Sequence, residues 1–142
     1  MNVTITRATS LPGTLRVPAD KSIAHRAVLL ASLANERTRV RPWPEAEDCQ
    51  RTLHLVQQLG IAATVSPDGL TIQGQGLEGW RAPSADLACG ESGTSLRLIC
   101  GLLAGQPFAS RLVAGPGLSR RPMQRIIEPL TQMGARIQGQ KG

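Results

Sequence analysis

An internal repeat constrains the fold of this chain more than any other feature of its sequence. Short segments recur at a spacing of about 70 to 74 residues, a period too long for a solenoid. Ser32-Leu33-Ala34 corresponds to Leu102-Leu103-Ala104, and segment 56–61 (VQQLGI) corresponds to segment 130–135 (LTQMGA). The repeat therefore predicts an α/β fold that contains two copies of one unit, with the order β-α-β-α-β-β.

Apolar periodicity and turn residues predict the elements of the first copy and of the segment before it. We expect strands at 2–6, 14–17, 38–41, 61–65 and 70–73, and helices at 22–34 and from about 45 to Gly60. The last two strands flank Pro67-Asp68-Gly69, which is typical of a hairpin turn. The glycine-rich segment 74–83 is predicted to be a loop.

The second copy restarts at Gly90. We expect helices at 95–104 and 122–133, and strands at 110–114 and 135–138. Pro122 suits the first position of a helix, whereas Pro129 predicts a kink or a break in the same helix. Because the second copy stops in its first closing strand, we expect a truncated domain with open sheet edges, through which the chain could self-associate.

Composition limits the core and the partners. Hydrophobic residues make up 41% of the chain and aromatic residues only 2%, which predicts an aliphatic core. The net charge is +6, and nearly all the cations are arginines, which suit phosphate and carboxylate groups. Nucleic acid is the usual alternative partner for such a charge. However, no basic run exceeds two residues, and aromatic side chains that could stack on bases are almost absent.

The cysteine pattern and the N-terminus indicate the compartment. Cys49, Cys89 and Cys100 are odd in number and lack metal-ligand spacing, so we expect reduced, mostly buried thiols and no metal site. The N-terminus has no apolar core of a leader peptide, and no apolar run approaches the length of a membrane span. We therefore expect a cytoplasmic protein that does not associate with membranes.

One segment, Pro18–Arg26 (PADKSIAHR), places three chemically useful residues at a predicted helix start. Lys21, Ser22 and Arg26 fall in its first turn and a half, where free backbone N–H groups and partial positive charge favour anions. Arg26 follows Ser22 by four residues and shares its face. Together the three could hold one phosphate or carboxylate. The alternative is a solvated helix cap with Asp20 as N-cap.

Three motifs together resemble 5-enolpyruvylshikimate-3-phosphate synthases: PADKSIAHR, then GESGTSLR at 90–97, and LSRRPMQRIIEPLTQMGA at 118–135. They occur in the family's order and spacing, and the similarity covers nearly the whole chain. The resemblance implies transfer of the enolpyruvyl group of phosphoenolpyruvate to the 5-hydroxyl of shikimate 3-phosphate, with release of phosphate, in the shikimate pathway of aromatic biosynthesis. It implies no metal or organic cofactor.

The resemblance also implies a domain organisation. Residues 1–15 would supply strands to the other domain of the family, and residues 16–142 would form an incomplete first domain. Repeat one would span about 16–75 and repeat two about 85–142, within an inside-out α/β barrel whose helices lie inside and whose sheets lie outside. Family members are several times longer, are mostly monomeric and close two domains over their substrates. Their acid/base carboxylate lies in later sequence, so we expect no turnover from this chain alone.

The resemblance assigns a role to each matching residue at the first helix start. Lys21 is similar to the catalytic lysine that contacts both substrates. Ser22 and Arg26 are similar to ligands of shikimate 3-phosphate. Asp48 matches an acidic family position before the second helix, although an acid in a first helical turn is also favoured on electrostatic grounds alone. His25, inside the motif, is predicted to have a capping or surface role.

The second and third motifs carry the expected phosphoenolpyruvate ligands. Gly93 is similar to the glycine whose backbone approaches phosphoenolpyruvate, and Thr94 lies beside it. Arg121, directly before Pro122, is similar to the arginine that holds the same substrate. Arg97 lies near them, with the alternative that it pairs with an acid on a neighbouring helix. The glycines have their own alternative, which is an ordinary role in caps and turns.

Two departures from the family pattern affect the region near Arg121. Glu91 stands where many members have asparagine, and a carboxylate beside an anionic substrate is costly unless it is paired or turned away. The Gly115-Pro116-Gly117 loop is shorter than usual. Two other functions remain open at this point. UDP-N-acetylglucosamine enolpyruvyl transferase shares the fold but favours asparagine at the position of Ser22 and has a reactive loop cysteine. A non-catalytic anion- or nucleic-acid-binding module would also fit the charge.

Overall fold

The computed structural model describes residues 2–10, 13–15 and 17–139 of the chain. These residues form, in order, α1 (Lys21–Leu33), β1 (Arg37–Val40), α2 (Glu47–Gln58), β2 (Ala62–Ser66), β3 (Gly69–Gln73), β4 (Leu87–Gly90), α3 (Gly93–Leu103), β5 (Leu112–Ala114), a 3₁₀ turn η1 (Leu118–Arg120) and α4 (Gln124–Gln132). The fold is therefore mixed α/β, as predicted. In the described ranges, no helix is both long enough and apolar enough to cross a membrane.

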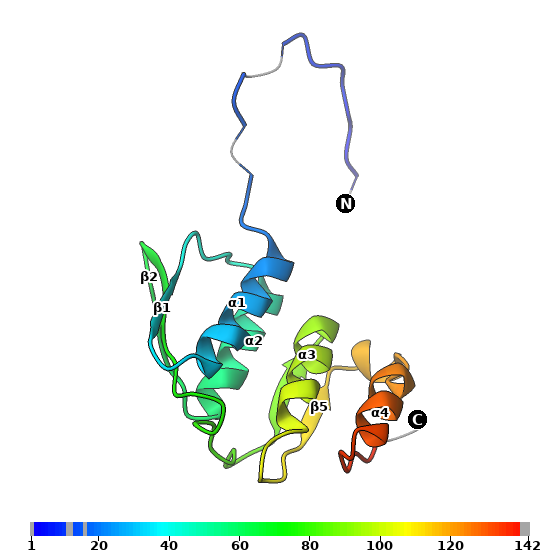
Figure 1. The fold of residues 1–142 in the computed structure, drawn as a ribbon. Coiled ribbons are helices and arrows are strands. Elements are labelled where there is room, and N and C mark those ends of the chain that lie inside the picture. Colours follow the sequence, from blue (N-terminus) through cyan, green and yellow to red (C-terminus); the bar gives the residue numbers. More distant parts are fainter. Residues whose placement is uncertain (1, 11–12, 16, 140–142) are drawn as a thin grey trace.

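The strands form two separate sheets. The first is antiparallel with the order β1-β3-β2, and Arg37 lies opposite Gln73 at one end. The predicted hairpin is confirmed, because β2 and β3 pair across the turn with Ser66 opposite Gly69. The second sheet pairs β4 with β5 in parallel, with Leu87 opposite Leu112. The first sheet packs against α1 and α2, and β4 packs against α2 and α3 (Figure 1).

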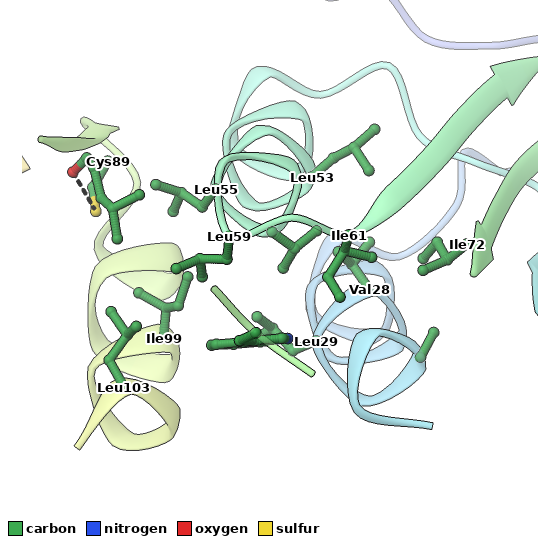
Figure 2. Packing of buried hydrophobic residues seen from close by; sticks show 14 of the residues in the cluster. Val28, Leu29, Leu53, Leu55, Leu59, Ile61, Ile72, Cys89, Ile99 and Leu103 are labelled. Atoms are coloured by element: carbon green, nitrogen blue, oxygen red, sulfur yellow. Dashed lines mark hydrogen bonds between the residues drawn. The ribbon is translucent and has the colours of Figure 1, made fainter. Parts of the chain in front are cut away.

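A continuous aliphatic core runs from α1 through α2 to α3. Leu55 of α2 and Leu59, the C-cap residue of the same helix, point toward Ile99 of α3, and all three side chains are fully buried (Figure 2). Val28 of α1 and Ile72 of β3 close the other side of the same cluster. Burial of Leu, Ile and Val side chains supplies the main favourable free energy of folding. The predicted aliphatic core is thus confirmed, and α2 is the element at its centre.

The predicted helices are confirmed, with changes at their ends. Helices α1 and α3 begin one or two residues earlier than expected, at Lys21 and Gly93. The position predicted for Pro122 is wrong, because α4 begins at Gln124 and has Met123 as its N-cap residue. Pro129 was predicted to kink or break this helix; α4 runs through that residue without a break, and a kink there stays a prediction.

Strand predictions failed where a strand lacks a neighbour. Residues 2–6 and 135–138 have no strand structure, and neither do 14, 15 and 17, whereas position 16 lies outside the described residues. The N-terminal segment extends away from the helices, so no sheet edge adjoins it (Figure 1). A strand needs such an edge for its backbone hydrogen bonds. Conversely, β4 was not predicted, because Ala88, Cys89 and Gly90 show no alternation of apolar and polar residues.

The remaining strand predictions differ from the structure only at their ends. Strand β1 begins and ends one residue earlier than predicted, and β5 is two residues shorter at its start. The glycine-rich segment 74–83 forms no helix or strand, as predicted.

Candidate active site

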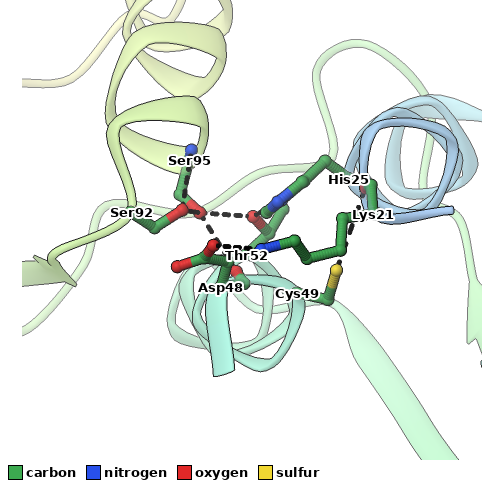
Figure 3. A network of polar contacts seen from close by, with 7 residues as sticks. All are labelled: Lys21, His25, Asp48, Cys49, Thr52, Ser92 and Ser95. Atoms are coloured by element: carbon green, nitrogen blue, oxygen red, sulfur yellow. Dashed lines mark hydrogen bonds and ion pairs between the residues drawn. The ribbon is translucent and has the colours of Figure 1, made fainter. Parts of the chain in front are cut away.

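The N-termini of three helices meet at one end of the molecule. Lys21 is the first residue of α1, Asp48 the second of α2, and Ser92 the N-cap of α3. Lys21 Nζ lies 3.0 Å from Asp48 Oδ2, and Ser95 Oγ lies 3.3 Å from the Asp48 carbonyl oxygen (Figure 3). Each helix N-terminus carries partial positive charge and free N–H groups. Their convergence creates a region that favours anions.

The start of α1 combines a conventional cap with exposed polar side chains. Asp20 accepts a hydrogen bond from the Ile23 N–H at 2.8 Å, which confirms it as the N-cap. Lys21, Ser22 and Arg26 are all exposed. Arg26 Nη1 donates to the Ser22 carbonyl oxygen at 2.9 Å, so the guanidinium is held at the first turn of the helix. The predicted grouping of these three residues is therefore present together with the cap.

Lys21 and Asp48 form the ion pair that links α1 to α2. Their side chains are 56% and 41% exposed, so the pair contributes little to the free energy of folding. The hydrogen bond that Lys21 donates to Asp48, and then the negative charge of that carboxylate, raise the pKa of Lys21 above its ordinary value. Lys21 is therefore protonated, and its ammonium group is directed toward Asp48.

Helix α3 begins with a buried glycine, Gly93, which leaves room for a side chain to pack against the helix backbone. The Ser92 side chain caps the helix by accepting from the Ser95 N–H at 3.2 Å. A β-carbon added to Gly93 would lie 2.6 Å from Arg97 Nη1, so the Arg97 guanidinium folds back over Gly93. Thr94 beside it is exposed.

Arg97 brings a second cation to the three helix ends. Among the described residues no Asp or Glu pairs with its side chain, and its buried Nε has no hydrogen-bond partner. The alternative that Arg97 pairs with an acid is therefore wrong for this part of the chain. Its charge remains available to an anion.

Glu91 is turned away from the helix ends and holds the following loop. Its Oε1 accepts from the Gly117 N–H at 3.0 Å, and its Oε2 accepts from the Leu118 N–H at 2.7 Å. Leu118 is itself buried and would lie 3.4 Å from a β-carbon at Gly93. The cost expected for a carboxylate at this position is thus avoided by pairing it with two backbone donors.

Arg121 is connected to the start of α3 through this loop. Its N–H donates to the Leu118 carbonyl oxygen at 3.0 Å, and its side chain is exposed. No contact joins the Arg121 side chain to Lys21 or Arg26 within the described residues. The structure therefore brings Lys21, Arg26 and Gly93 to one end of the molecule, with Arg121 on the adjoining segment.

The prediction for His25 is wrong. It is 2% exposed, and its Nδ1 lies 2.6 Å from Thr52 Oγ1 between α1 and α2. Burial lowers the pKa of His25 below its ordinary value. The sequence does contain a signal for this position, because His25 follows buried Ala24 and precedes buried Val28 on the same face of α1. Thr52, Ser92 and Ser95 were likewise not singled out from the sequence.

The other features of the chain do not add to this site. A groove of about 480 Å³ lies between α1 and β1, and a smaller hollow of about 140 Å³ lies along β1 and β3. Neither is lined by the predicted site residues. Cys49 and Cys89 are buried and Cys100 is half-buried, all as free thiols, which confirms that prediction. In the described ranges, no cluster of His, Cys, Asp and Glu side chains could hold a metal ion.

Solved structures place this arrangement in a known class of fold. A 2.37 Å structure of EPSP synthase from Acinetobacter baumannii matches with a TM-score of 0.85 and 41% identity, over 89% of this chain and 28% of that chain. A second EPSP synthase structure from the same organism matches with a TM-score of 0.85 and 40% identity, over 92% of this chain and 30% of that one. The class is therefore that of the EPSP synthase fold.

Sequence comparison identifies the family. The EPSP synthase (3-phosphoshikimate 1-carboxyvinyltransferase) family matches residues 5–142. The 3-phosphoshikimate 1-carboxyvinyltransferases of Streptococcus pyogenes serotype M2 (strain MGAS10270) and serotype M1 are each 48% identical over 135 residues, which is 95% of this chain. The chain belongs to the EPSP synthase family. It spans 31% of the length of these two relatives.

Proposed function

We propose that the protein containing this chain transfers the enolpyruvyl group of phosphoenolpyruvate to the 5-hydroxyl of shikimate 3-phosphate and releases phosphate. The observation that carries this proposal is the convergence of the N-termini of α1, α2 and α3 beside Lys21, Arg26 and Arg97. Membership of the EPSP synthase family supports this reaction, and the grouping of helix N-termini with these cations supports binding of two anions. The partners are then two small molecules, without nucleic acid or a membrane, in the cytoplasm.

Electrostatics explain why this reaction needs such a place. Both substrates are multiply charged anions, and two unit charges about 4 Å apart interact by about 4 kcal/mol at an effective dielectric constant near 20. Several such repulsions must be offset before the reacting atoms can meet. Helix N-termini and charge-assisted hydrogen bonds from Lys and Arg offset this repulsion between the anions.

The start of α1 would bind shikimate 3-phosphate. Ser22 and Arg26 face solvent on the first turn, and the guanidinium is already held against the Ser22 carbonyl oxygen. Lys21 would contact both substrates, because its ammonium group points across to α2 and lies toward α3 (Figure 3). Asp48 would orient Lys21 through their ion pair.

The start of α3 and the loop held by Glu91 would bind phosphoenolpyruvate. Gly93 would meet the ligand through its backbone once the Arg97 guanidinium, which lies 2.6 Å from the position of a β-carbon, moves aside. Thr94 adds an exposed hydroxyl. Arg97, whose guanidinium lies against Gly93, and Arg121, the C-cap residue of η1, would supply the positive charge.

Catalysis would rest on orientation and electrostatic stabilisation by these groups. Carbon 2 of phosphoenolpyruvate gains cationic character as carbon 3 takes up a proton, and the acceptor oxygen bonds to carbon 2 as its own proton is released. Carbon 3 then loses a proton, the double bond forms again, and phosphate leaves carbon 2. The residues hold the two substrates side by side and stabilise the phosphate as it departs. We propose that no metal or organic cofactor takes part.

The architecture of the whole protein follows from the same proposal. The two repeats, about 16–75 and 85–142, would belong to an inside-out α/β barrel domain, and residues 1–15 would pair with the other domain. The chain alone would then form only one side of the active site and would not catalyse the reaction. A steady-state assay of phosphate release from both substrates tests this, because turnover by residues 1–142 would contradict it.

Binding of shikimate 3-phosphate tests the assignment of α1. We expect Lys21→Ala and Arg26→Ala each to weaken binding about tenfold or more in isothermal titration calorimetry, since each removes a charged hydrogen-bond donor. Arg37→Ala is the matched control, because it removes an equal charge from an exposed position on β1. Equal affinity in all variants would refute the assignment. Binding of duplex DNA that is unaffected by the first two changes would favour the nucleic-acid alternative.

A further inference from the structure

A continuous chain of buried polar side chains crosses the core between the three helix starts. His25 Nδ1 lies 2.6 Å from Thr52 Oγ1, which lies 2.6 Å from Ser95 Oγ, which lies 2.7 Å from Ser92 Oγ (Figure 3). The exposed fractions of the four side chains are 3% or less. We call these four residues the hydroxyl–imidazole network. It joins α1 to α3 through α2.

Stability alone does not explain why this network exists. Replacing both members of a buried hydrogen-bonded pair by apolar groups of similar shape is often nearly neutral, and the surrounding core is aliphatic. A fully bonded polar network instead restricts how its elements pack, since any displacement leaves a buried group without a partner. The network therefore specifies one arrangement of the three helix starts.

The protons of the network have one arrangement that satisfies every link. The Ser95 N–H donates to Ser92 Oγ, so that oxygen already accepts one bond. Ser95 Oγ donates to the Asp48 carbonyl oxygen, which can only accept, so Ser95 Oγ accepts from both Ser92 and Thr52. The Thr52 hydroxyl then gives its proton to Ser95 and accepts from the Nδ1–H of His25. The geometry thus places a proton on His25 Nδ1.

Both ends of the network adjoin residues that the proposed function uses. His25 lies one turn after Lys21 and directly before Arg26 on α1. Ser92 caps α3 directly before Gly93. In the middle, Ser95 Oγ also contacts the carbonyl oxygen of Asp48, whose carboxylate holds Lys21. A shift of the network would therefore move the two proposed subsites relative to each other.

We propose that His25, Thr52 and Ser95 are positioning residues, which set the distance between the anion-binding starts of α1 and α3. This inference rests on the proposed function and adds residues that do not touch substrate themselves. Thr52 is the central member, because it alone joins the imidazole on α1 to the hydroxyls on α3.

The experiment removes the central hydroxyl and then restores it. Thr52→Val keeps the shape of the side chain but lacks the hydroxyl, whereas Thr52→Ser keeps the hydroxyl. Ser32→Ala is the matched control, since Ser32 is buried on the same helix as His25 but bonds only to the Leu29 carbonyl oxygen. Affinity for shikimate 3-phosphate is measured by calorimetry, and the ring nitrogens of His25 are observed by ¹⁵N NMR.

The expected result separates positioning from simple folding. Thr52→Val weakens shikimate 3-phosphate binding about tenfold and shifts the His25 Nδ1 resonance, since that nitrogen loses its partner. Thr52→Ser restores both the affinity and the resonance, and Ser32→Ala changes neither. If circular dichroism shows that Thr52→Val does not fold, Ser95→Ala is judged by the same affinity criterion.

Two negative results have different meanings. Binding by the unmodified protein together with equal binding by Thr52→Val, or by Ser95→Ala where that variant is used, overturns the positioning role and leaves the proposed function intact. No binding of shikimate 3-phosphate by the unmodified protein overturns the proposed function, and the positioning role falls with it.

Discussion

The carboxylate of Glu91 is expected to hold the loop that leads to Arg121, and Glu91→Ala tests this directly. The change removes both acceptors for the Gly117 and Leu118 N–H groups, which lie 3.0 Å and 2.7 Å from the two carboxylate oxygens. Hydrogen bonds to charged groups contribute about 1.5–3 kcal/mol each, but Glu91 is exposed and water can replace part of that. We therefore assign about 1 kcal/mol to each bond and about 2 kcal/mol to the pair.

Amide hydrogen exchange measures this free energy at the two donors themselves. Because about 1.4 kcal/mol corresponds to a factor of ten, we expect the protection factors of the Gly117 and Leu118 amides to fall about 30-fold in Glu91→Ala. Glu91→Gln keeps one acceptor oxygen and should lower them about fivefold. The Leu87 amide, which donates to the Arg111 carbonyl oxygen at 2.8 Å in the neighbouring sheet, should be unchanged.

The effect of Glu91→Ala should be local and specific to this carboxylate. Glu78→Ala removes an exposed carboxylate from a distant loop and should leave all of these amides unaffected. Unchanged protection of Gly117 and Leu118 in Glu91→Ala would refute the role of Glu91. An equal loss at Leu87 would also refute it, because the effect would then be global unfolding.

Two further predictions concern buried titratable groups. Burial lowers the pKa of His25 from its ordinary 6.5, so the unfolded chain takes up a proton first as the pH falls through that value. The urea midpoint should therefore fall when the pH is lowered from about 7.5 to about 5.5. This fall should be smaller in His25→Gln and unchanged in the control His54→Gln, whose altered residue is exposed. An equal fall in all three proteins would count against this. Burial raises the pKa of Cys89 to about 12, so iodoacetamide at about pH 8 should label Cys89 only in denaturant. Labelling of Cys89 in the folded protein, mapped by mass spectrometry, would contradict that expectation.

The helices could be predicted from the sequence because their signals are local. Apolar periodicity and capping residues placed α1 and α3 to within two residues, and α2 was expected to end at Gly60. Strands were less predictable, because a strand depends on a neighbour that the local sequence does not specify. Residues 2–6 alternate well but have no sheet edge, whereas β4 pairs with β5 although Ala88 and Gly90 give no strand signal.

Some features of the candidate site could likewise be predicted from the local sequence, and others depend on packing between elements. The pattern at the start of α1 predicted Lys21 and Arg26, because every helix N-terminus carries partial positive charge, whereas Gly93 was predicted from the resemblance to the family. The direction of the Glu91 side chain and the burial of His25 depend on which elements pack beside them. The direction of Glu91 comes from its contact with the η1 loop, and the partner of His25 comes from the packing of α1 on α2. For His25 the local sequence indicates only the buried face of α1.

The predicted internal repeat would give a physical reason for the two proposed anion sites. Asp20 and Ser92 are the N-caps of α1 and α3, so each predicted copy would contribute one helix N-terminus to the same end of the molecule. Positive charge is supplied differently at the two helix starts. In the first copy Lys21 stands at the helix start itself, whereas in the second Arg97 folds back over Gly93 from one turn later. Because α2 lies between them and contacts both through Asp48 and Thr52, the predicted duplication would explain how the proposed function holds two like-charged ligands side by side.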